Sequence, residues 1–174
     1  MRVSKRVAVA LLATAALVGS ATTAMSALGH DSGRGQGDHR DRGGATVLKT
    51  TLAPSVLTDP TLHGVAHGNA PWVLRRGTAR LRQGGRLDVR VRGLVIPGAP
   101  GNGTPGPVTT VDASLYCGAD DTAVGTTPSA PISRAGDAHM TGTLSLPAKC
   151  LAPVVLVHPN GNGAAYIAAS GFGG

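Results

Sequence analysis

Residues 78–92 alternate between apolar and polar side chains with a period of two, and this pattern limits the possible fold more than any other feature of the chain. Leu87, Val89 and Val91 alternate with charged residues, and a shorter alternating run precedes a Gln-Gly-Gly turn. A period of two is typical of a strand with one face on a core and the other in solvent. The segment therefore predicts a β-hairpin.

The length of the hairpin turn follows from the requirement that the two faces stay separate. A three-residue loop at 83–85 pairs Leu81 with Leu87 and Arg80 with Asp88, so that apolar side chains share one face. A two-residue Gly-Gly loop would mix the faces. We therefore expect the three-residue loop, with a glycine in the left-handed conformation that such a loop needs and an Arg80–Asp88 cross-strand pair.

The rest of the chain repeats this plan of short strands separated by turns. No stretch of helical length shows a period of 3.6, and the chain contains no glutamate, a residue that helices use freely. Residues 119–136 are expected to be a polar loop. Further strands are expected at 47–52, 72–76, 108–117, 138–146, 153–157 and 164–170. About seven strands predict an all-β domain, a single antiparallel two-sheet sandwich of immunoglobulin type, with a small barrel as the alternative.

The N-terminal segment has the three parts of a secretory signal peptide. Arg2, Lys5 and Arg6 precede an apolar run at 7–18, and small residues follow to Ala27. The run is shorter than the roughly 20 apolar residues that span a membrane. We expect a signal peptide at 1–27, a glycine-rich disordered linker at 28–46 and a β-sandwich domain at 47–174. The protein would then be secreted, and not transmembrane after cleavage.

Cys117 and Cys150 are the only cysteines in the chain. Two cysteines in an exported protein predict one disulfide, which by the chain-entropy model would stabilise the fold by about 3–4 kcal/mol. A redox pair or a metal site is the alternative. A redox pair usually has closer spacing, and a metal site needs further ligands.

The strongest concentration of charge lies in the same hairpin. Residues 75–92 contain seven arginines against one carboxylate, Asp88. The expected register places five of the arginines on one outward face: Arg80, Arg82, Arg86, Arg90 and Arg92. Such a face would suit an anionic polymer of the cell envelope, and the absence of nearby aromatic residues argues against sequence-specific nucleic-acid recognition. The alternative is the solvated face of an edge hairpin, where charges discourage association between sheet edges.

No catalytic or cofactor motif is present, so we assign no catalytic residue and no cofactor. His63 and His67 have a spacing that would join them on a helix, but flanking glycines and prolines argue against a helix there, so they are weak metal-ligand candidates. His139 and His158 are interpreted as solvated. The leading hypothesis is an exported, non-enzymatic β-sandwich module at or outside the cell envelope. The alternatives are a secreted metal-binding protein or enzyme that uses His63 and His67, and polyanion binding through the arginine-rich face.

Three segments carry a resemblance to known proteins: 70–95, 108–117 and 147–170, the last of which lies at the run Leu-Pro-Ala-Lys-Cys-Leu-Ala-Pro that starts at Leu146. Together they resemble a group of exported bacterial β-sandwich proteins of unassigned function. The alternating hairpin is also loosely similar to chordin-type repeats, although their histidine-containing motif is not matched. The resemblance implies an exported β-domain, and it transfers no active residue.

Overall fold

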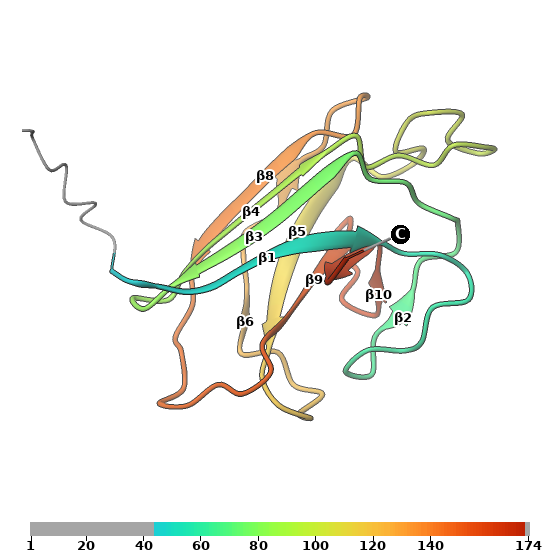
Figure 1. Cartoon of the computed structure of the whole chain (residues 1–174). Helices are drawn as coiled ribbons and strands as arrows, with labels where there is room; N and C mark the ends of the chain where they lie inside the picture. The colour runs from blue at the N-terminus through green and yellow to red at the C-terminus, as the bar shows by residue number, and fades with distance from the viewer. Residues whose placement is uncertain (1–43, 173–174) are drawn as a thin grey trace, which may run out of the picture. The chain divides into compact units, whose positions relative to one another are not determined.

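The computed structural model describes residues 44–172, which form an all-β domain without a helix (Figure 1). The expected signal peptide and the expected linker up to residue 43 lie outside the described residues. The strands are β1 (Thr46–Pro54), β2 (Ala66–His67), β3 (Arg76–Arg82), β4 (Arg86–Arg92), β5 (Thr110–Tyr116), β6 (Gly125–Thr126), β7 (Ala130–Pro131), β8 (Ala138–Thr143), β9 (Val154–Pro159), β10 (Ala165–Tyr166) and β11 (Ala168–Ser170).

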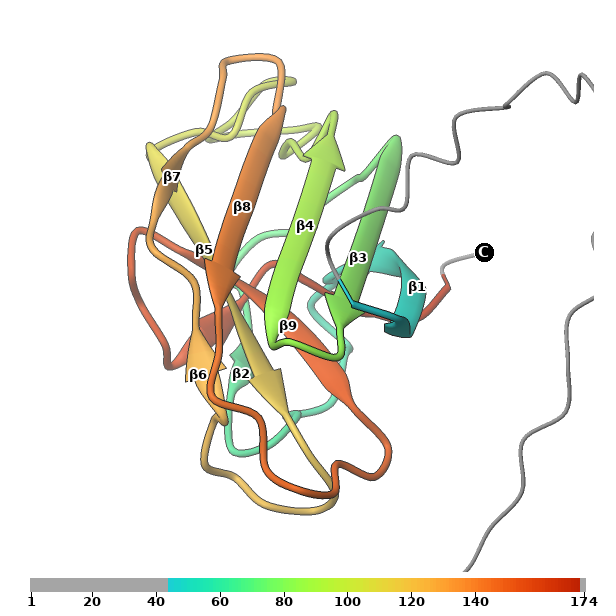
Figure 2. The same cartoon turned by 90° about the vertical axis from the view of Figure 1, so that its left-hand side faces the viewer.

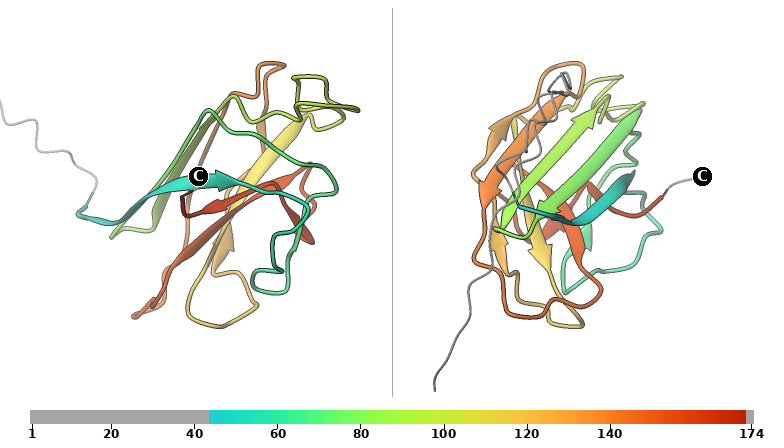
Figure 3. Two further views of the ribbon diagram at one scale, coloured as in Figure 1. Left: turned by 45° about the vertical axis from the view of Figure 1, so that its right-hand side comes forward. Right: turned by 60° about the vertical axis from the view of Figure 1, so that its left-hand side comes forward.

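One continuous sheet contains most of these strands, in the order β6-β5-β9-β11-β1-β3-β4-β8, with β7 also paired to β5. Its pairings are antiparallel, whereas β2 and β10 form a separate parallel pair. The long strand β1 joins two groups of strands, because Thr46–Thr51 pair with β3 and Leu52–Pro54 pair with β11 (Figure 3). The sheet therefore curves into a nearly barrel-shaped domain, and the expected seven-stranded, two-sheet sandwich is not confirmed.

The sheet stays open between β8 and the segment 125–131 that holds β6 and β7. A Cβ atom at Gly142 in β8 would lie 3.2 Å from the Cα atom of Thr127 and from the side chain of Pro128. The two backbones thus approach closely, yet no strand pairing joins them within residues 44–172. Prolines in this segment lack the N–H groups that a closing ladder needs.

The hairpin of β3 and β4 has the register that the alternation predicts. Leu81 lies opposite Leu87, and Arg80 lies opposite Asp88. The connecting loop holds three residues, and its last, Gly85, has a φ of 80°. The three-residue loop, which we predicted from the need to keep apolar and polar side chains on separate faces, is therefore confirmed.

The core fills the interior of this curved sheet with small and branched side chains. Leu87, Val89 and Met140 are fully buried on β4 and β8, and they face Ala113 and Val157 on the opposite wall. Trp72 and Leu94 belong to the same cluster. Aliphatic residues thus make up most of the core, because the chain contains few aromatic residues.

A second layer covers the outer side of β5 and β9. Val65, Tyr116, Leu156 and Tyr166 form a separate buried cluster there. As a result β9 is buried on both faces, which suits the continuous apolar run of residues 153–157. The alternation in β5 is misleading, because Asp112, with Ser114 and Tyr116, is buried under this layer rather than exposed. The expected loop at 119–136 also contains β6 and β7.

Cys117 and Cys150 form a disulfide, with their Cα atoms 5.1 Å apart. The bond ties the end of β5 to the loop before β9, where the N–H of Gly118 also donates a hydrogen bond to the Leu151 carbonyl. A disulfide of this kind is suited to a non-reducing, extracytoplasmic environment. Across residues 44–172, no helix is long and apolar enough to cross a membrane.

Candidate anionic-ligand face

Strands β1, β3, β4 and β8 lie side by side on one wall of the domain (Figure 2). The outward positions of these strands carry a concentration of cationic side chains, which we call the basic face. The strand registers place every second residue of each strand on this surface. Threonines occupy many of the other outward positions, including Thr51, Thr78 and Thr141. The cationic residues of the basic face are Lys49, Arg76, Arg80, Arg82, Arg86, Arg90 and Arg92.

Three members of this surface were missed by sequence reasoning: Lys49, Arg76 and His139. Lys49 lies opposite Arg80, Arg76 lies opposite Arg92, and His139 lies opposite Arg90. Arg76 could have been found, because the alternation of Arg80 and Arg82 extends back to it with the same parity. Lys49 and His139 required knowledge of which strands flank the hairpin, and the sequence does not give that order.

The arginine-rich hairpin lies inside the sheet and not at its edge. β3 pairs with β1 on one side, and β4 pairs with β8 on the other. The expected role of these arginines as protection for an edge hairpin is therefore wrong, because both hairpin strands have their backbone hydrogen bonds satisfied by neighbours. The nearest edge strand is β8, whose outward positions carry His139 and threonines rather than arginine.

Asp88 is the single carboxylate within the four strands of the basic face, and Asp137, which immediately precedes β8, lies at the end of the face, 4.0 Å from Arg75. The Nε2–H of His139 donates to Asp88 Oδ2 at 2.8 Å, and the Nε–H of Arg90 donates to Oδ1 at 3.1 Å. Partial burial alone would raise the pKa of Asp88, but the hydrogen bonds and charges of His139 and Arg90 outweigh burial and lower it. The expected Arg80–Asp88 ion pair is not formed, because these two partners occupy the carboxylate although Arg80 lies directly opposite.

Outside the basic face, carboxylates outnumber cations in the described domain. The basic face has seven cations and one carboxylate, whereas the rest of residues 44–172 has three cations and five carboxylates. Asp120 and Asp121 lie in the loop after β5, beside His63 and Gly64 of the second layer. The positive charge is therefore concentrated on one wall of the domain, and the carboxylates of this loop lie on the opposite wall.

The two weak metal-ligand candidates have separate hydrogen-bonding roles. His63 donates from Nδ1 to the carbonyl oxygen of Asp120 at 2.8 Å and stacks on the Tyr116 ring, with 4.8 Å between ring centroids. His67 donates from Nδ1 to the carbonyl oxygen of Gly68. Within the part of the chain that the structure describes, no three His, Cys, Asp or Glu side chains form a group that could hold a metal ion.

His158 is not the solvated histidine that its place beside Pro159 suggested. It lies in β9 opposite Asp112 and is fully buried. Its Nδ1 lies 2.7 Å from the carbonyl oxygen of Ala165, so Nδ1 must carry the proton. Its Nε2 has no hydrogen-bond partner among the described residues.

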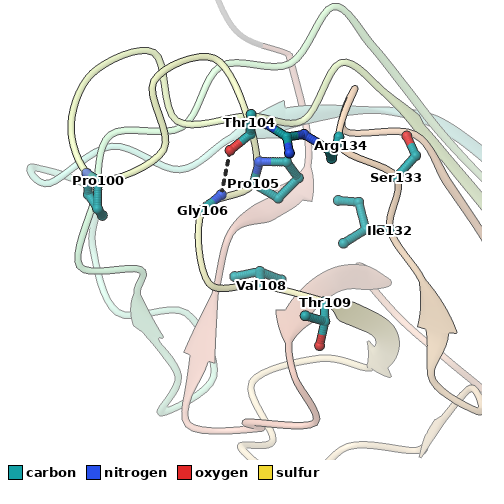
Figure 4. Close-up of a pocket in the computed structure, with 9 residues that line it drawn as sticks. All are labelled: Pro100, Thr104, Pro105, Gly106, Val108, Thr109, Ile132, Ser133 and Arg134. Atoms are coloured by element: carbon teal, nitrogen blue, oxygen red, sulfur yellow. Dashed lines mark hydrogen bonds between the residues drawn. The ribbon is translucent and has the colours of Figure 1, made fainter.

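Two depressions lie where the long loop after β4 meets its neighbours. The first has a volume of about 410 Å³ and contains one charged residue, Arg134. Figure 4 shows Thr104, Pro105 and Arg134 on one side of it and Val108 on the other, with the Thr104 hydroxyl accepting the Gly106 N–H. The second, about 440 Å³, shares Val108 and Pro100 with the first but has no charged residue in its wall.

No family model, no curated protein and no solved structure matches this chain. The basic face therefore has to be interpreted from its own geometry and charge.

Proposed function

We propose that this protein is an exported, non-enzymatic β-domain that binds an anionic polymer outside the cytoplasm through the basic face. The central position of the arginine-rich hairpin carries the proposal. Seven cations are collected over adjacent strands with one carboxylate, and protection of a sheet edge does not account for them. The disulfide supports an extracytoplasmic location.

The repeat of a β-sheet suits a polymer with regularly spaced negative charges. Outward side chains recur about every 6–7 Å along a strand, and neighbouring strands lie about 4.8 Å apart. Arginine dominates the basic face, and its planar guanidinium binds phosphate or carboxylate groups in a bidentate manner. The hydroxyls of Thr78 and Thr141 supply further donors, whereas the Thr51 hydroxyl donates to the carbonyl oxygen of Gly171. The absence of aromatic residues from the face favours recognition of backbone charge over recognition of bases.

The proposal is tested by measuring the affinity of the full chain for polyphosphate as a function of salt concentration. The test variant replaces Arg76, Arg80 and Arg86 with Gln, because these residues are exposed and form no ion pair within residues 44–172. Each arginine removed from the face should reduce the slope of log K against log salt by about 0.7, so the slope falls by roughly 2. The affinity at about 50 mM salt should fall at least roughly tenfold.

The matched control removes three charges from outside the strands of the basic face, by replacing Arg75, Arg134 and Lys149 with Gln; Arg75 lies at the end of the hairpin, where Asp137 at 4.0 Å offsets its charge. This variant should keep the wild-type slope within about 0.5. Equal losses of affinity in the two variants would mean that only net charge matters, and the proposal of a specific face would be wrong. Unchanged binding in the test variant would also contradict it.

A further inference from the structure

Strand β3 has an outward row of side chains in which every charged residue is an arginine. The outward positions of this row are Arg76, Thr78, Arg80 and Arg82. The first and the last are six residues apart, which corresponds to about 20 Å of extended strand. The outward row of β4, by comparison, contains Asp88, and Asp137 immediately precedes β8. A negatively charged chain can therefore follow β3 from end to end without passing over a carboxylate.

Each arginine of this row lies beside a cation of a neighbouring strand. The three pairs are Arg76–Arg92, Arg80–Lys49 and Arg82–Arg86. The first two pairs are directly opposite each other in the strand registers, and the third flanks the hairpin loop. Like charges directly opposite each other on one face of a sheet are destabilising. An anionic group bound between the members of a pair would remove this repulsion, so each pair is suited to one phosphate group.

The density of these cations indicates which polymer fits them. The three pairs place six cations along about 20 Å, or about one for every 3.4 Å. One strand of a nucleic acid carries a phosphate at about this interval, roughly 3.4 Å, and in inorganic polyphosphate every unit of the chain is charged. A polyuronate carries its carboxylates one per sugar ring, and its charges are therefore more widely spaced. The cation density thus favours a chain of phosphate groups.

The shape of the basic face limits the form of the chain. The core fills the inner side of the curved sheet, so the basic face is its outer, convex side (Figure 3). Strands in a sheet also twist along their length. A rigid double helix would touch a convex, twisted surface over a short stretch, whereas a flexible single chain can follow one strand.

From these features we propose that the ligand of the basic face is a single flexible chain of phosphate groups that lies along β3. Its phosphates bind between the paired cations, and the hydroxyl of Thr78 donates to the chain between the first two pairs. This inference rests on the proposed function and adds the class of the ligand and its direction. A chain that crossed the strands instead would pass from Arg80 to Asp88 within one strand spacing.

The length of the ligand tests whether it spans the row. Tripolyphosphate is too short to reach from Arg76 to Arg82, whereas linear polyphosphate of about 15 units covers the whole row. The longer chain should bind the full-length protein at least roughly tenfold more tightly per molecule, because one chain then engages several cation pairs. Equal affinities of the two probes would contradict a ligand that lies along the strand.

Two further polymers of the same contour length test the chemical class. Polygalacturonate should bind at least roughly tenfold more weakly than polyphosphate, and equal binding would contradict a phosphate ligand. Oligothymidylate distinguishes the two sources of phosphate groups. Tighter binding of oligothymidylate supports a phosphodiester chain, and tighter binding of polyphosphate supports a condensed phosphate chain. If neither binds, this inference and the proposed function are both wrong.

A charge inserted at two positions tests the direction. Thr78→Glu places a carboxylate in the row of β3, whereas Thr141→Glu places the same charge on β8, on the other side of β4. Thr78→Glu should reduce the affinity for long polyphosphate at least roughly tenfold, and Thr141→Glu should reduce it less than about threefold. The neutral variant Thr78→Gln should stay within about twofold of the wild type, which separates the effect of charge from a disturbance of the strand.

The outcome separates this inference from the proposed function. Equal losses in the two glutamate variants would show that the chain does not follow β3. If the variant that lacks Arg76, Arg80 and Arg86 still loses affinity in that case, the basic face remains the binding surface and only the direction is wrong.

Discussion

At the residue scale, Asp88 sets the electrostatic character of the basic face. Its carboxylate is shared by Arg90 and His139, and so it neutralises part of the charge that an anionic ligand would meet. Its lowered pKa keeps it ionised through the neutral and mildly acidic range. The residue therefore orients two side chains while it opposes anion binding.

Replacement of Asp88 with Asn should separate these two effects. We expect polyphosphate affinity to rise by several fold, because the face gains one unit of positive charge. The free energy of unfolding at pH 7 should fall by less than about 1 kcal/mol, as for other exposed ion pairs. Binding and urea denaturation of the two proteins measure both quantities, and weaker polyphosphate binding by the variant would contradict the prediction.

The pH dependence of the same variant has a defined sign. A carboxylate with a lowered pKa in the folded state stabilises the fold above its unfolded pKa of about 3.9, and that contribution is lost as the pH falls through the folded pKa. The difference in stability between wild type and Asp88→Asn should therefore be present at pH 7 and shrink below about pH 4. A difference that stays constant down to about pH 2 would rule out this origin.

Single residues also show which positions and contacts can be predicted from the sequence and which cannot. The position of Arg80 opposite Asp88 followed from alternation alone, because register is a property of two adjacent strands. The choice of partner for Asp88 did not, because His139 comes from β8, and only the fold brings that strand beside β4. His158 was misjudged because Ala165, whose carbonyl oxygen its ring contacts, belongs to the two-residue strand β10, which gives no periodic signal.

At the element scale, the β3–β4 hairpin is defined by a loop in which two adjacent glycines have different roles. Gly85 has a positive φ, and an added Cβ would collide with the carbonyl oxygen of Leu144. Gly84 has open space where a Cβ atom would be added, and its φ is not positive. The pattern Gln-Gly-Gly predicts a loop, but only the structure distinguishes these roles.

Alanine substitutions at the two glycines should therefore differ in their effect on stability. Gly85→Ala should lower the free energy of unfolding by roughly 2 kcal/mol or more, because both the backbone conformation and the contact with Leu144 become unfavourable. Gly84→Ala should change it by less than about 0.5 kcal/mol. Chemical denaturation of the pair is the measurement, and equal effects would contradict the assigned loop conformation.

Strand β5 shows how a clear pattern can give the wrong exposure. Its alternation of Asp112, Ser114 and Tyr116 with apolar residues is typical of a strand with a solvated face. The second layer formed by β2, β10 and their neighbouring loops buries that face, so polar side chains lie inside. β2 and β10 contain two residues each, which is too short for a periodic signal.

At the scale of the whole molecule, β1 decides the architecture. The sequence established that the chain is all-β, because the period of two recurs and no helical period is present. The sequence could not distinguish a sandwich from a near-barrel. The difference depends on whether one strand pairs both with the group that contains β3, β4 and β8 and with the group that contains β5, β9 and β11. β1 does so, with β3 along its first part and with β11 along its last residues.

The disulfide links two segments that are 33 residues apart in the sequence, at the ends of the neighbouring strands β5 and β9, and it should contribute to global stability. Replacement of Cys117 and Cys150 together with Ser should lower the free energy of unfolding by about 3–4 kcal/mol, because the unfolded chain regains the entropy of an open loop. Urea denaturation measures the change, with thiol labelling of the wild type to verify that both sulfurs are oxidised. If the free energy of unfolding falls by less than about 1 kcal/mol, the bond contributes little and the prediction is wrong.

The unequal distribution of charge between the two walls also affects the encounter that precedes binding. With cations on one wall and most carboxylates elsewhere, the described domain should have an electric moment directed across the curved sheet. The field of an anionic polymer would exert a torque on this moment and turn the basic face toward the polymer during approach. The effect acts over about one Debye length, roughly 10 Å at 0.1 M salt. Dilute salt should therefore accelerate productive collisions, beyond any gain in the lifetime of the complex.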